Sequence, residues 1–136
     1  MNIDNAESLT KVFGRWPSFH DAEVVRITLD RSGDEGPNLE AVIYVFEPTN
    51  AVDSTGHYVL VNHTEVTFRF ANVELCSFGG FNRQNVLASL DVADIEPSAH
   101  EGRRLRIEMP SLYGLAASFE CTGASIINAR PWRPAV

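Results

Sequence analysis

The chain opens with apolar residues at helical spacing and then changes to an alternating pattern. Residues 5–13 carry an apolar stripe with a period of three to four positions, which predicts a short amphipathic helix. Gly14 is suited to end that helix in the left-handed conformation, and Pro17 prevents its continuation. A helix of this length is marginal by itself in water. We therefore expect it to pack against the rest of the protein.

After Pro17, apolar and polar residues alternate, which is the spacing of half-buried strands. This pattern predicts about seven strands, at residues 24–30, 39–46, 58–62, 65–75, 104–109, 115–121 and 124–129. The strand at 39–46 is apolar on both faces, so we expect both faces to be covered. Residues 47–56 and 91–102 are predicted to be loops, because they are polar and contain Gly and Pro. Residues 84–90 fit either a strand or a helix.

These elements predict an α+β fold, with a single domain over residues 1–136. One N-terminal helix is expected to pack on a mainly antiparallel sheet of about seven strands, because short turns connect most successive strands. The last two strands flank Thr122 and Gly123 and are expected to form a hairpin. The inward-facing positions that should be buried are Leu9, Phe13, Val25, Ile27, Ile43, Val45, Phe68, Phe70, Ile107 and Phe119.

Composition and charge narrow the classes of partner. Apolar residues make up 44% of the 136-residue chain, which is enough for a hydrophobic core. The net charge of −7 argues against nucleic acid or an anionic membrane as the ligand and suits a basic partner. We see no signal peptide and no membrane-length apolar run, so we expect a cytosolic protein. Cys76 and Cys121 lie in apolar, strand-like sequence and are expected to be free, buried thiols.

One short segment concentrates residue types that are costly to place without a partner. Residues 13–24 contain Trp16 and Phe19, followed directly by His20, Asp21 and Glu23. A structural interpretation is that the aromatic side chains join the helix to the first strand, while Asp21 or Glu23 is hydrogen-bonded nearby.

A functional interpretation of the same segment is a metal or ligand site built from its histidine and carboxylates. Such a site needs three or four convergent ligands, and the remaining histidines, His57, His63 and His100, show no paired ligand spacing. The chain also lacks a phosphate-binding glycine loop and a nucleophile elbow. We therefore predict no catalytic residues, no metal and no cofactor.

Acidic residues in the predicted turns offer a second candidate surface. Unlike charges attract over long range, so an acidic surface could steer a basic protein into contact. The residues predicted to bind such a partner are Asp34, Glu35, Asp94 and Glu96.

The segment at residues 13–24 resembles the opening of the Immunity protein 50 family, which occurs among bacterial polymorphic toxin systems. Looser similarity continues along the chain, at residues 29–31, Phe46, 68–70, 82–86 and 114–121. The family pattern marks Trp16, Phe19, His20, Asp21 and Glu23, without assigning them to the fold or to a contact surface. The resemblance implies a small cytosolic protein that neutralises a cognate toxin by binding it.

Two hypotheses therefore stand after the sequence. The first is a non-catalytic immunity protein that binds a toxin with a basic surface. The alternative is a small metal- or ligand-binding β domain that uses His20, Asp21 and Glu23. A toxin gene immediately upstream would favour the first, and a metal in the purified protein would favour the second.

Overall fold

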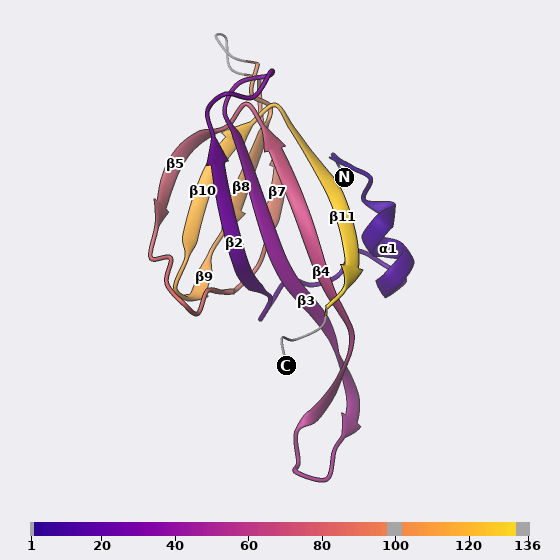
Figure 1. The fold of residues 1–136 in the computed structure, drawn as a ribbon. Coiled ribbons are helices and arrows are strands. Elements are labelled where there is room, and N and C mark those ends of the chain that lie inside the picture. Colours follow the sequence, from indigo (N-terminus) through magenta and orange to yellow (C-terminus); the bar gives the residue numbers. More distant parts are fainter. Residues whose placement is uncertain (1, 98–101, 133–136) are drawn as a thin grey trace.

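The computed structural model describes residues 2–97 and 102–132, and it consists of two facing β-sheets with a helix at one side (Figure 1). In order across the larger sheet, the strands are β1 (Ile3–Asp4), β11 (Gly123–Pro131), β4 (Tyr58–Ala71), β3 (Asn38–Val52), β2 (Glu23–Asp30), β6 (Val86–Leu87) and β9 (Ser111–Tyr113). The smaller sheet contains β5 (Glu74–Gly79), β10 (Ala116–Cys121), β8 (Leu105–Met109) and β7 (Asp91–Asp94). Within the described residues, only β1 and β11 pair in parallel, so the predicted α+β, mainly antiparallel class is confirmed.

The predicted N-terminal helix is α1 (Glu7–Phe13), which lies beside β11 and also contacts β4 (Figure 1). It ends at Gly14, whose φ of 77° is left-handed and whose N–H donates to the Thr10 carbonyl oxygen at 2.8 Å. Leu9 and Phe13 are its buried residues. A seven-residue helix is thus held by the packing of this apolar face.

The core lies between the two sheets. Phe68 and Phe70 of β4 stack at 5.9 Å between ring centroids, and Phe70 meets Phe119 of β10 edge-on at 5.0 Å. These contacts join the larger sheet to the smaller one. The residues predicted to be buried that are indeed buried are Leu9, Phe13, Ile43, Val45, Phe68, Phe70, Ile107 and Phe119.

Val25 was predicted to be buried and is instead 43% exposed. A register shift between Val24 and Arg26 inserts an extra residue into β2 opposite β3, which is a β-bulge. Val24 takes the inward position and is only 1% exposed. Ile27, beyond the bulge, is partly buried against the core. The strict two-residue alternation therefore fails at one point of the strand.

Two predicted loops contain strands. Residues 47–56 were predicted to be a loop, but β3 continues to Val52 and pairs with β4. The predicted strands 58–62 and 65–75 are also wrong in extent, because β4 runs without a break from Tyr58 to Ala71 and residues 74–75 belong to β5 in the smaller sheet. Pro48 is accommodated beside a register irregularity in this hairpin, where a missing N–H is tolerated. Residues 91–102 include β7, which pairs with β8.

The predicted hairpin between the last two strands is also wrong. β10 pairs with β5 and β8 in the smaller sheet, whereas β11 pairs with β4 and β1 in the larger one. The chain crosses between the sheets at Thr122, whose N–H donates to the Ala71 carbonyl oxygen at 2.9 Å. A short connection thus joins two layers here.

The two cysteines lie in different environments. Cys121 is buried, as predicted, and burial raises the pKa of its thiol to about 11. Cys76 is exposed on the edge strand β5, with its sulfur 3.7 Å from Arg106 Nη1. The prediction of burial is therefore wrong for Cys76, because side chains on an edge strand have a neighbouring strand on one side only and are less covered than those on a central strand.

Candidate functional site

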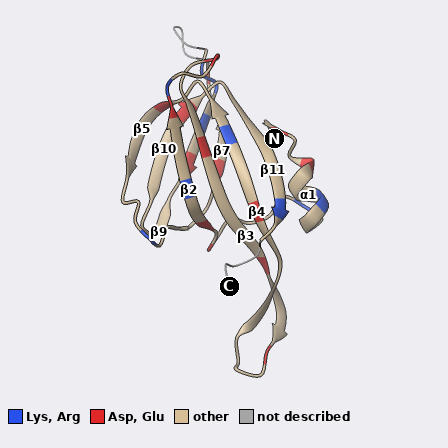
Figure 2. Ribbon diagram, in the orientation of Figure 1, with Lys and Arg blue, Asp and Glu red and all other residues tan. Residues whose placement is uncertain are grey.

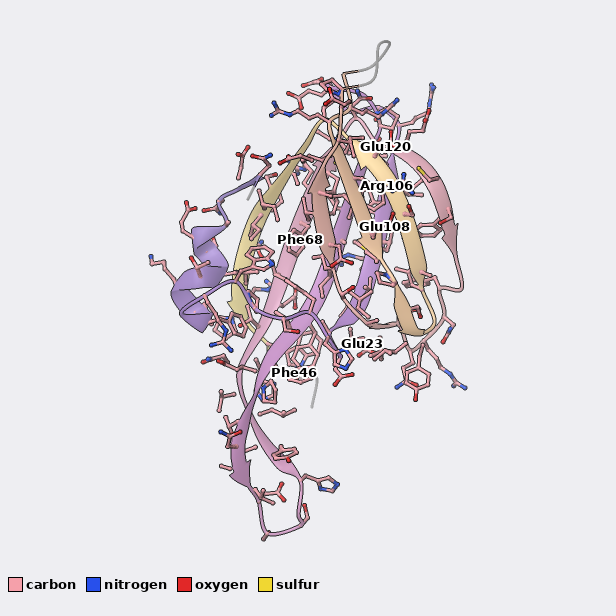
Figure 3. All side chains as sticks on the ribbon, turned by 180° about the vertical axis from the view of Figure 1, so that it is seen from behind. Glu23, Phe46, Phe68, Arg106, Glu108 and Glu120 are labelled. Carbon is pink, nitrogen blue, oxygen red and sulfur yellow. The ribbon has the colours of Figure 1, made fainter. Side chains whose placement is uncertain are left out.

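The segment between α1 and β2 crosses the inner face of the larger sheet (Figure 3). Trp16 lies 5.7 Å from Phe19 and 6.3 Å from Phe68 between ring centroids, and Phe19 lies 5.9 Å from Phe68. Phe19 is fully buried and Trp16 is half-buried against the core. The two aromatic side chains of the segment that connects α1 to β2 therefore pack on each other and on Phe68 of β4.

His20 and Asp21 follow this joint and are both exposed. His20 Nδ1 lies 3.1 Å from the Ala88 carbonyl oxygen, which accepts a hydrogen bond when Nδ1 carries the proton. Asp21 has a left-handed φ of 70°, and its N–H donates to the Leu87 carbonyl oxygen at 2.9 Å. The turn is therefore held by the backbone and by the His20 ring.

A hydrogen bond accepted by the Asp21 or Glu23 carboxylate was predicted to tie this turn, but among the described residues neither carboxylate accepts one. The Asp21 carboxylate is more than half exposed, and its Oδ1 lies 3.7 Å from His20 Nε2. Glu23 is half-buried in β2, opposite Tyr44 of β3. Burial and then the Glu23 charge raise the pKa of the Tyr44 hydroxyl.

Residues that the metal hypothesis requires are not gathered into one site. Over residues 2–97 and 102–132, no group of three or more His, Cys, Asp or Glu side chains could hold a metal ion. His57 lies near the tip of the β3–β4 hairpin and His63 packs on Tyr44. His100 lies outside the described residues.

A groove separates this segment from the base of the β3–β4 hairpin. Its volume is about 360 Å³. Arg15, His20 and Asp21 line one side, and the hairpin side is mostly apolar, with Phe46, Pro48, Tyr58 and Leu60. Arg15 Nη2 reaches across to Glu47 Oε1 at 3.4 Å. The family-marked residues His20 and Asp21 therefore face a partly apolar depression that also carries both signs of charge.

The hairpin itself extends well beyond the two sheets (Figure 1). Val52 and Tyr58 are 56% and 65% exposed on it, and Leu60 is exposed at its base. Its tip is ordered by Asp53, whose Oδ1 accepts from the Thr55 N–H and hydroxyl at 2.8 and 2.6 Å and from the His57 N–H at 3.1 Å. These hydrogen bonds lower the pKa of the Asp53 carboxyl.

An aromatic cluster lies over the hairpin end of β3, on the outer face of the larger sheet. The ring centroids of Trp132 and Tyr44 lie 4.8 Å apart, and those of Tyr44 and His63 lie 5.8 Å apart, with both pairs stacked. The Tyr44 hydroxyl group is also hydrogen-bonded to His63 Nδ1. Phe46 lies 5.4 Å from Tyr44. The prediction that both faces of the strand at 39–46 are covered holds here. Sequence reasoning missed His63 and Trp132 as the covering residues, because they lie far from this strand in sequence.

The outer face of the smaller sheet carries a charged network around Arg106 (Figure 3). Arg106 Nε lies 2.6 Å from Glu108 Oε1, Nη1 lies 3.3 Å from Glu120 Oε2, and Nη2 donates to the Ser118 hydroxyl at 2.8 Å. The bond from Arg106 lowers the pKa of the Glu108 carboxyl. One guanidinium thus bridges two carboxylates and a hydroxyl group within the smaller sheet.

The four acidic candidates lie toward the end of the molecule opposite the hairpin (Figures 1 and 2). Asp34 and Glu35 lie in the turn between β2 and β3, and Asp94 ends β7, with Glu96 shortly after it. Asn2 Nδ2 donates to Asp94 Oδ1, so this carboxylate is already engaged. Basic residues share the same end of the molecule (Figure 2).

Comparison with known proteins identifies the family of this chain. Among the described residues, no helix is both long enough and apolar enough to span a membrane. No curated protein and no solved structure matches the chain. The family model for Immunity protein 50 matches residues 5–132, which include the whole groove and the hairpin. The chain therefore belongs to the Immunity protein 50 family.

Proposed function

We propose that this protein binds a cognate bacterial toxin domain in the cytosol and neutralises it by occupying its surface, without catalysing a reaction. The observation that carries this proposal is the family match over residues 5–132, since immunity proteins act on partner toxins. The ordered, partly apolar groove at the family-marked residues His20 and Asp21 supports a protein partner.

The partner is expected to have a basic surface. The net charge of −7 attracts such a surface, and electrostatic attraction of this kind raises association rates and weakens with salt. We propose that Asp34, Glu35, Asp94 and Glu96 contribute to this long-range attraction. Reversing their charges should slow association at low ionic strength, leave dissociation unchanged, and have a smaller effect as salt is added.

Co-expression with the toxin encoded by the neighbouring upstream gene tests the proposal. Cells that make this protein should survive induction of the toxin, and the two proteins should co-purify. An active toxin that still kills the cells, with no complex recovered, would contradict the immunity function.

A further inference from the structure

We propose that the toxin docks on the groove and hairpin surface, defined by Asp21, Phe46, Pro48, Tyr58 and Leu60. The occupant that fits is an apolar segment of the toxin with a neighbouring Lys or Arg side chain. This inference rests on the proposed function and names the contact surface that function would use.

The exposed apolar side chains of the hairpin are not needed by the core. Tyr58 is 65% exposed, and the hairpin that carries it projects past both sheets (Figure 1). Apolar side chains gathered on a projecting element, rather than scattered singly, mark an interaction surface. Tyrosine is also among the residues that most often carry the binding energy of protein interfaces.

The hairpin tip is ordered before any partner arrives. The three hydrogen bonds that Asp53 accepts from Thr55 and His57 fix the turn between the two strands. At the base, Asn62 Nδ2 donates to Glu47 Oε2 at 3.0 Å, and Thr49 Oγ1 donates to the Val59 carbonyl oxygen at 2.7 Å. A preorganised element loses less conformational entropy on binding than a flexible loop does.

Charge on this surface selects a basic segment. Residues 46–62 contain Glu47 and Asp53 but no Lys or Arg, and only acidic positions are coloured on the hairpin in Figure 2. Arg15 pairs with Glu47 within the groove. The Asp21 carboxylate is more than half exposed beside the apolar wall, with the His20 ring 3.7 Å from it, so it remains accessible to a cation. A cationic side chain on the toxin would pair with Asp21 while its apolar neighbours fill the groove.

The chain offers a matched pair of variants for a test. Tyr58→Ala with Leu60→Ala removes two exposed side chains from the proposed surface. Leu112→Ala with Tyr113→Ala removes the same two side-chain types from exposed positions on β9, which lies three strands from β3 in the larger sheet. Asp21→Asn removes the groove charge and keeps a residue that tolerates a positive φ.

Binding of the purified toxin domain from the upstream gene would be measured by biolayer interferometry, with circular dichroism to establish that each variant is folded. We expect the Tyr58 and Leu60 double variant to raise Kd at least about tenfold, mainly through faster dissociation. Asp21→Asn should raise Kd about threefold or more and reduce its salt dependence. The β9 double variant should bind like the wild type.

Each contrary result has a distinct meaning. If the wild type binds the toxin and both groove variants bind it equally well, the proposed surface is wrong while the immunity function stands. If the wild type does not bind, the proposed function itself fails. A concentration-dependent dimer in light scattering that the Tyr58 and Leu60 variant abolishes would assign the surface to a second copy of this chain and overturn the inference.

Discussion

Replacing Asn85 with Ala should destabilise the fold, because this buried amide joins three separate segments. Its Oδ1 accepts from the Asn82 N–H at 2.9 Å and from the Leu115 N–H at 3.0 Å. Its Nδ2 donates to the Asn82 carbonyl oxygen at 2.6 Å and to the Val24 carbonyl oxygen at 3.4 Å. Asn85 is 3% exposed, so water does not replace these bonds readily.

The magnitude follows from the donors that the substitution leaves unpaired. A buried donor without a partner costs about 1–3 kcal/mol, which applies in full to the N–H of Leu115, since that residue is buried. Asn82 is exposed, so its partly buried N–H adds only about 1 kcal/mol. The total loss should be roughly 2–4 kcal/mol, which would lower the urea midpoint by about 1–2 M at an m-value near 2 kcal/mol/M.

Equilibrium urea unfolding, followed by circular dichroism, measures this loss. Gln84→Ala is the matched control, because it removes an amide side chain from the adjacent exposed position and should change stability by less than about 0.5 kcal/mol. If the free energies of unfolding of the two variants agree within that margin, the buried amide does not organise this part of the fold and the reasoning is refuted.

Other expected outcomes follow from single features of the fold. Phe68→Ala should lower the free energy of unfolding by about 3–5 kcal/mol, because the Phe68 ring is fully buried on the larger sheet against Trp16. Urea titration measures this loss. Asp21→Ala should cost about 1–2 kcal/mol through its left-handed φ, whereas Asp21→Asn should be nearly neutral in the same titration. If the two variants lose equal stability, the Asp21 carboxylate, and not the left-handed backbone, stabilises the turn. Iodoacetamide should alkylate Cys76 and leave Cys121 unmodified in the native protein, as read by mass spectrometry, because only Cys121 is buried with a raised pKa. Since the pKa of Asp53 is lowered in the fold, its stabilisation is present above the unfolded value of about 4 and is lost as pH falls through the folded value. The melting temperature of Asp53→Asn should therefore fall less than that of the wild type between about pH 6 and pH 3.

The sequence by itself determined the features that depend on local spacing. The end of α1 at Gly14 follows from its freedom to adopt a positive φ and from Pro17 beyond it. The inward positions of β4, such as Phe68, follow from two-residue alternation. The motif that carries Trp16, Phe19 and Asp21 was visible as an unusual concentration of residue types, and its resemblance to the Immunity protein 50 family is now established by the family match.

The tertiary structure alone decided how these elements are arranged. Which strands pair is set by packing between residues far apart in sequence, so the passage from β10 in one sheet to β11 in the other has no local signal at Thr122 and Gly123. The bulge that turns Val25 outward exists only opposite β3. The groove likewise forms because β3 pairs with β4 beyond Pro48, which brings the hairpin beside His20 and Asp21. The spacing of residues along the chain does not predict that these distant segments lie close together.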